Sequence, residues 1–183
     1  LKPALKITQT GHIGVIGTRG TLGSEKFHRL LTSLEDQAQF TVQPCNGLAL
    51  AIEQSTHLTM GAPATERITE LLQTYTREMG DFGQAPGQMD TLVLGCTHYV
   101  FAESALRELL GPQVHLVSTG QPVARQTRRL LEAAALLRSG PGPHALANRI
   151  SLLSNGDLAS LQAAAQRWLG LPHAVCQRAD AHV

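Results

Sequence analysis

Short apolar runs alternate along the chain with stretches that have helical periodicity. The apolar runs predict strands at residues 12–17, 39–43, 91–94 and 114–117, and apolar positions three or four residues apart predict helices between them. The run at 91–94 is continuously apolar, which is typical of a strand covered by helices on both faces. The pattern therefore predicts an α/β fold, a parallel sheet flanked by helices with right-handed crossovers.

The same alternation continues after residue 118. A helix is predicted from apolar residues at helical spacing, namely Val123, Leu130, Leu131, Ala134 and Leu137. Residues 139–143 read Ser-Gly-Pro-Gly-Pro and form the most linker-like stretch of the sequence. A fifth strand at 150–153, a last helix and an extended piece around 174–176 complete the chain. The last helix is expected to turn four side chains inward: Leu158, Leu161, Trp168 and Leu169.

Composition narrows the class of protein. The chain has 183 residues, of which 43% are hydrophobic and 16% charged, with a net charge of +1. This apolar share excludes extensive disorder, and no apolar run approaches the ~20 residues that a membrane-spanning helix needs. A net charge near zero without basic blocks gives no reason to expect binding to nucleic acid or to a membrane surface. Cys45, Cys96 and Cys176 are widely spaced and odd in number, which favours reduced thiols in a cytoplasmic protein.

The candidate chemistry lies in the loops that follow the strands, because ligands of parallel sheets bind beyond the carboxyl ends of the strands. Cys96 follows the strand at 91–94 and a glycine, and we expect a helix to begin immediately after it. The free N–H groups and dipole of such a helix favour a thiolate, and His98 is placed to hold or relay a proton. The alternative interpretation of Cys96 is a small buried cysteine at a strand end.

Other candidates have a structural interpretation beside the functional one. The loop that contains Thr18 and Thr21 is interpreted either as a binding site for a carboxylate or phosphate or as a plain helix N-cap. Glu53 ends an apolar run and is either a solvated helix end or a functional carboxylate. Cys45 follows the second strand and could face the same cleft as Cys96, whereas Cys176 is expected in a buried strand. The histidines and cysteines lack metal-ligand spacing, so no metal site is predicted.

The run Leu94-Gly95-Cys96-Thr97-His98-Tyr99 resembles the signature around the second catalytic cysteine of the glutamate racemase family. Further blocks resemble that family in the same order along the chain. They are Ile13-Gly14-Val15-Ile16-Gly17-Thr18, Cys45 leading to Glu53, Ser118-Thr119-Gly120, Ser154-Asn155-Gly156-Asp157 and Trp168-Leu169-Gly170.

The resemblance implies a cofactor-independent amino-acid racemase that interconverts L- and D-glutamate. It implies that two cysteines act as acid and base on opposite faces of the α-carbon, and that Cys96 is one of them. It also implies a cytoplasmic enzyme that supplies D-glutamate for peptidoglycan and so affects cell shape, with a homodimer as a candidate assembly. The remaining roles it implies are substrate contacts by Thr97, His98, Thr18 and Thr21, and support of the acid/base groups by His98 and Glu53.

The family's Asp-Ser-Gly loop and Ala-Cys-Asn-Thr block, which holds the first catalytic cysteine, do not occur in this sequence. The resemblance therefore implies a nearly complete second domain at 1–117 and a return segment of an incomplete first domain at 118–183. We expect little racemisation by this chain alone, and apolar faces without partners after Ser118. Two alternatives stay open: a non-catalytic module that binds a small carboxylate or phosphate, with Cys96 a bystander, and a racemase for aspartate.

Overall fold

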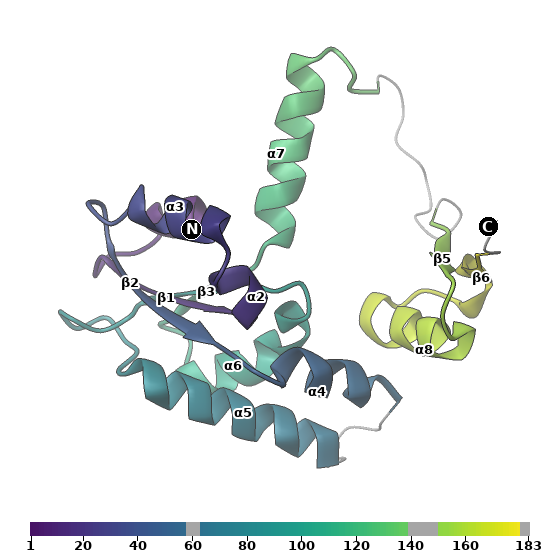
Figure 1. Cartoon of the computed structure of the whole chain (residues 1–183), viewed down its shortest axis with the longest axis horizontal. Helices are drawn as coiled ribbons and strands as arrows, with labels where there is room; N and C mark the ends of the chain where they lie inside the picture. Colours follow the sequence, from purple (N-terminus) through teal and green to yellow (C-terminus); the bar gives the residue numbers. More distant parts are fainter. Residues whose placement is uncertain (58–62, 139–149, 180–183) are drawn as a thin grey trace.

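The computed structural model describes residues 1–57, 63–138 and 150–179 (Figure 1). The elements up to residue 117 are α1 (Lys2–Leu5), β1 (His12–Gly17), α2 (Arg19–Leu22), α3 (Glu25–Thr32), β2 (Gln39–Pro44), α4 (Leu48–Gln54), the 3-10 helix η1 (Ser55–His57), α5 (Pro63–Met79), β3 (Thr91–Leu94), the 3-10 helix η2 (Tyr99–Ala102), α6 (Glu103–Leu110) and β4 (His115–Val117). After them come α7 (Gly120–Ala133), β5 (Leu152–Ser154), α8 (Leu158–Leu169), the 3-10 helix η4 (His173–Val175) and β6 (Cys176–Arg178).

The predicted parallel sheet is confirmed. Among the described residues it has four strands in the order β2-β1-β3-β4, and every neighbouring pair is parallel. Val15 in β1 lies opposite Val42 in β2 and Val93 in β3. Because all four strands run in one direction, the loops that leave β1, β2 and β3 emerge at the same edge of the sheet.

Helices cover both faces of this sheet (Figure 1). Ile16 and Leu92 face the larger core cluster, which is completed by residues of α4, α5, η2 and α6. Ile13 and Val15 point to the opposite face, where α1, α2 and α3 contribute the smaller cluster. The continuous apolar runs of the strands thus supply a buried side chain to each face in turn, as expected of a sheet between two helical layers.

The region after β4 is packed differently. Figure 1 shows α7 projecting away from the sheet, and none of its residues is buried. Its predicted apolar face exists, but Val123 and Leu130 are largely exposed. The linker predicted at 139–143 lies outside the described residues. No helix in the described ranges is long and apolar enough to cross a membrane.

The last part of the chain forms a small unit of its own. Strands β5 and β6 pair in parallel, with α8 as the crossover between them. Ala165, Val175 and Cys176 form its buried cluster, so the expectation of a buried strand position for Cys176 is confirmed. The inward orientation expected for Leu169 is wrong, since its side chain is 58% exposed. Leu169 is the final residue of α8, and Gly170 in the left-handed conformation ends the helix there.

Candidate functional site

Two backbone hydrogen bonds bring the loops after β1, β2 and β3 together at the carboxyl edge of the sheet. The Gly95 N–H donates to the Ile16 carbonyl at 2.7 Å, and the Cys45 N–H donates to the Gly17 carbonyl at 2.9 Å. These bonds continue the two ladders of β1 beyond the ends of β2 and β3. Thr18 follows directly, so this edge carries the hydroxyl and thiol groups that the sequence singles out.

Cys96 and His98 form the chemical centre of this edge. The Cys96 Sγ lies 3.9 Å from the His98 Nδ1, and both side chains are half-buried. Thr97 between them is exposed. The sulfur is therefore neither sealed in the core nor distant from the imidazole, which confirms the proximity expected from the motif.

The helix expected directly after Cys96 is not an α-helix. Cys96 to His98 form a turn, η2 begins at Tyr99, and α6 begins only at Glu103. The explanation for the thiolate based on the first turn of an α-helix is therefore wrong. Tyr99 and Ala102 are three residues apart and both buried, and the three-residue period of a 3-10 helix places them on one side.

Gly95 allows the turn to approach β1 closely. An added Cβ at this position would lie 2.8 Å from the Ile16 carbonyl oxygen. That oxygen belongs to a buried strand and accepts the Gly95 N–H, so it cannot move aside without loss of the hydrogen bond. A residue with a side chain would push Cys96 away from the edge of the sheet.

Two tyrosines that are not among the predicted site residues hold the loop after β2. Tyr99 donates its hydroxyl to the Cys45 carbonyl at 3.2 Å, and Tyr75 donates to the Asn46 carbonyl at 2.7 Å. Tyr99 is fully buried, so it ties the Cys96 turn to the neighbouring loop from within the core. Its signal in the sequence is an aromatic residue directly after a polar motif.

The remaining cysteines have a different environment from Cys96. Cys45 is 3% exposed, and burial, followed by the negative charge of Glu78, raises the pKa of its thiol to about 12. Cys45 therefore stays protonated near neutral pH and cannot act as a base. Cys176 is buried in β6, so Cys96 is the cysteine that reaches the surface.

Thr18 and Thr21 adopt the helix-capping arrangement. Thr18 is the N-cap of α2, and its Oγ1 accepts the Thr21 N–H at 3.3 Å. The two hydroxyl oxygens lie 2.9 Å apart. The structural interpretation of these residues is confirmed, and both hydroxyls remain at least partly accessible at the same edge as Cys96.

Glu53 lies on α4, whereas Cys96 and His98 lie in the turn after β3. It is exposed on α4 and lines a cavity of about 380 Å³ between α4 and the last unit. The other lining residues are Thr56, Ser154, Asp157, Ser160, Leu161 and Ala164. Within the described part of the chain, no hydrogen bond joins Glu53 to Cys96 or to His98.

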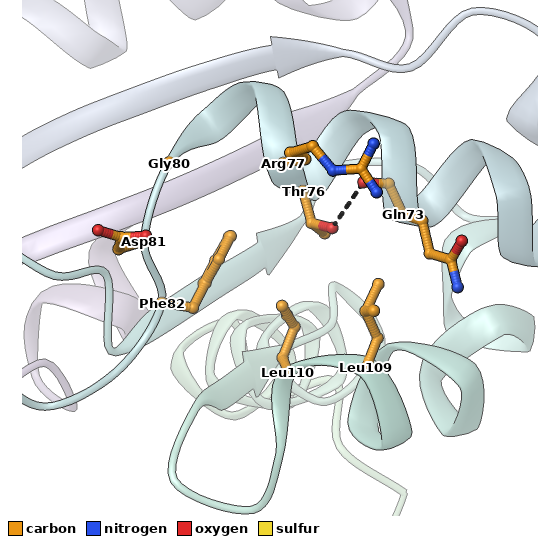
Figure 2. A pocket seen from close by; sticks show the side chains of 8 residues that line it. All are labelled: Gln73, Thr76, Arg77, Gly80, Asp81, Phe82, Leu109 and Leu110. Carbon is orange, nitrogen blue, oxygen red and sulfur yellow. Dashed lines mark hydrogen bonds between the residues drawn. The ribbon is translucent and has the colours of Figure 1, made fainter.

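A cavity of about 460 Å³ lies where α5 and α6 end, at the opposite edge of the sheet (Figure 2). Arg77 and Asp81 lie at its rim, and Phe82 and Leu110 form an apolar wall. None of the residues predicted for the functional site lines it. Among the described residues, no group of three or more histidine, cysteine or acidic side chains could hold a metal ion.

A partly accessible thiol beside an imidazole, at the carboxyl edge of a parallel α/β sheet, can abstract a proton or attack a small molecule covalently. This combination defines a site for acid/base or nucleophilic chemistry on a small molecule. No family model matches the chain.

Comparison with known proteins is more specific. Over 171 residues the chain is 40% identical to a glutamate racemase of Ralstonia pickettii, covering 93% of this chain and 55% of the relative. It is 38% identical over 183 residues to a glutamate racemase of Ectopseudomonas mendocina, covering 100% of this chain and 61% of that one. The chain spans about half the length of the curated relatives it matches.

Solved structures agree with these relatives. A glutamate racemase of Bacillus anthracis matches with a TM-score of 0.76 at 27% identity, covering 100% of this chain and 62% of that one. The Escherichia coli glutamate racemase, in complex with L-glutamate and the activator UDP-MurNAc-ala, matches with a TM-score of 0.66 at 25% identity, covering 91% and 58%. The chain is thus related to the glutamate racemases, and the resemblance seen in its motifs is confirmed.

Proposed function

We propose that this chain carries one face of a cofactor-independent glutamate racemase site, with Cys96 as the acid/base group of that face. The observation that carries the proposal is the 3.9 Å separation of the Cys96 sulfur and the His98 imidazole at an accessible edge of the sheet. The names of the relatives support it, as does the L-glutamate bound to the Escherichia coli structure.

The reaction transfers one proton on each face of the substrate. The Cys96 thiolate takes the α-proton, so the C–H bond breaks, an S–H bond forms and the electron pair stays on the α-carbon. A second acid returns a proton to the opposite face, which inverts the centre. His98 accepts the proton of Cys96 and restores the thiolate. Polar contacts to the substrate carboxylates stabilise the developing charge, and Thr97, Thr18 and Thr21 are the candidates for them.

The second acid is not one of the other two cysteines of this chain. Cys45 is held as a buried thiol on the same sheet edge, and Cys176 belongs to the separate β5–β6 unit. We therefore expect this chain alone to show little racemisation. Residues 1–117 would form one racemase domain, and residues 118–183 would return to another. The sheet topology supports a boundary after β4, because among the described residues no later strand joins the four-stranded sheet.

Three finer assignments belong to the same proposal. The role of Glu53 in supporting the acid/base groups rests on the resemblance to the racemases; Glu53 lies on α4, which follows the loop after Cys45. The wider role is that of a cytoplasmic enzyme that supplies D-glutamate for peptidoglycan and so affects cell shape. Assembly as a homodimer is proposed with it, and rests on the relationship to the racemases.

Ligand protection of Cys96 tests the proposal. Iodoacetamide modification of each cysteine is followed by peptide mass spectrometry, with L-glutamate, D-glutamate, aspartate or inorganic phosphate present. We expect both glutamate enantiomers to slow modification of Cys96 while Cys176 keeps its rate. Equal protection by phosphate would favour the anion-binding module, and stronger protection by aspartate would change the substrate. No protection by any amino acid would refute the proposed role.

A further inference from the structure

Trp168 joins the last unit to the turn that carries the proposed chemistry. It is the single tryptophan of the chain and lies on α8, far along the sequence from Cys96. Its ring stacks on Phe101, with the ring centroids 4.7 Å apart and an angle of 26° between the planes. The indole is half-buried and packs against the larger core cluster instead of the small cluster of its own unit.

Two further contacts orient the indole. Its Nε1–H donates to the Thr56 Oγ1 at 3.4 Å, which ties α8 to η1 at the end of α4. The guanidinium carbon of Arg167 lies 4.7 Å from the centre of the ring. The indole is thus held by an aromatic stack, a hydrogen bond and a cation–π contact, each of which restricts its rotation.

Phe101 passes this restraint to His98. The Phe101 N–H donates to the His98 carbonyl at 3.0 Å, so the residue under the indole is bonded to the backbone of the proposed proton acceptor. Tyr99 anchors the same turn from the core side through the Cys45 carbonyl. The turn is therefore restrained from inside by Tyr99 and from outside by the stack of Phe101 on Trp168.

The pairing of Cys96 and His98 is sensitive to such a restraint. A sulfur–nitrogen separation of 3.9 Å is near the outer limit for a hydrogen bond to sulfur. A shift of a few tenths of an ångström in the turn would separate the two groups. We infer that Trp168 is a positioning residue, which acts through Phe101 to keep the His98 imidazole beside the Cys96 sulfur; this inference rests on the proposed function.

A double-mutant cycle on the full 183-residue chain tests this coupling. The measured quantity is the rate at which iodoacetamide modifies Cys96, and His98→Asn is made in each background. In the chain that keeps Trp168, we expect His98→Asn to slow the modification of Cys96 several-fold. In the Trp168→Leu background, we expect the effect of His98→Asn to shrink by roughly threefold or more, as the loss of an aromatic stack predicts.

Companion variants separate positioning from simple loss of structure. Phe101→Leu breaks the same stack from the other side and should reduce the His98 effect equally, whereas Trp168→Phe keeps a stacked ring and should retain most of it. Leu169→Ala changes the exposed neighbour of Trp168 and should leave the effect at its original size. Buried Cys45 reports folding in every sample, because its modification accelerates when the chain unfolds.

The outcomes distinguish this inference from the function beneath it. If His98→Asn does not change the rate of Cys96 modification in the chain that keeps Trp168, the proposed acid/base pair fails, and the positioning role fails with it. If His98→Asn slows Cys96 equally with and without the indole, the pair stands and the role of Trp168 is refuted. Trp168→Phe keeps a stacked ring. If it removes the effect of His98→Asn as completely as Trp168→Leu does, the aromatic stack is not the cause of the coupling.

Discussion

Helices α5 and α7 have similar sequence patterns and different surroundings. Leu71 of α5 is 8% exposed against the sheet, whereas Leu130 of α7 is 57% exposed and projects into solvent. Both helices present apolar residues at helical spacing. The difference shows that periodicity predicts the helix and its apolar face, whereas burial depends on whether a sheet lies opposite that face.

The largest expected effect comes from the packed region. Leu106 in α6 is fully buried in the larger core cluster, so Leu106→Ala leaves a cavity among well-packed neighbours. We expect the free energy of unfolding to fall by about 2–5 kcal/mol. Urea unfolding followed by circular dichroism measures this, and a loss below about 1 kcal/mol would mean that the core is loosely packed.

Gly95→Ala tests the close approach of the Cys96 turn to β1. Because the new Cβ would lie 2.8 Å from the Ile16 carbonyl oxygen, we expect a loss of about 1–3 kcal/mol in the free energy of unfolding. Modification of Cys96 by iodoacetamide should also change. Gly120→Ala is the matched control in the open region, since nothing lies within 4 Å of its added Cβ. Equal stability of the two variants would contradict the tight edge.

Acid should weaken the packed region through Asp90, which is buried directly before β3. Burial alone would raise the pKa of Asp90, but hydrogen bonds from the Thr8 hydroxyl and the Gln9 and Thr10 N–H groups outweigh it and hold the pKa below its usual value. A lowered pKa in the folded state stabilises the fold above about pH 4, and this contribution is lost as the pH falls further.

Asp90→Asn should therefore cost about 1–2 kcal/mol near neutral pH and reduce the dependence of unfolding on acid. Asp36→Asn at the surface is the control and should change the free energy of unfolding by less than about 0.5 kcal/mol. Denaturant titrations at several pH values check both variants. An unchanged acid dependence in Asp90→Asn would rule out this carboxylate as the source.

The smallest effect is expected on α7. Leu130→Ala removes an exposed side chain that no described element covers, so the free energy of unfolding should change by less than about 0.5 kcal/mol. The same unfolding assay applies, with Leu106→Ala as the counterpart in the packed region. A cost above about 2 kcal/mol would show that α7 is covered in solution and would erase the contrast between the two regions.

The sequence predicts what depends on local pattern and on the geometry of parallel sheets. The strands, the common edge of their loops and the closeness of Cys96 to His98 follow from apolar runs and from residues two apart in one turn. The 3-10 helix after His98 could not be foreseen, because its form depends on Tyr99 and Ala102 both reaching the core. The stack of Trp168 on Phe101 joins distant parts of the chain, and periodicity carries no information on such pairs.

The reactivity of Cys96 relative to Cys45 and Cys176 tests the central claim most directly. Iodoacetamide modification of the three thiols is measured in the folded chain and again in denaturant, where local environments are lost. We predict that folded Cys96 reacts at least about tenfold faster than either other cysteine and that the rates converge on unfolding. Equal protection of all three thiols in the folded chain would contradict an accessible sulfur paired with an imidazole.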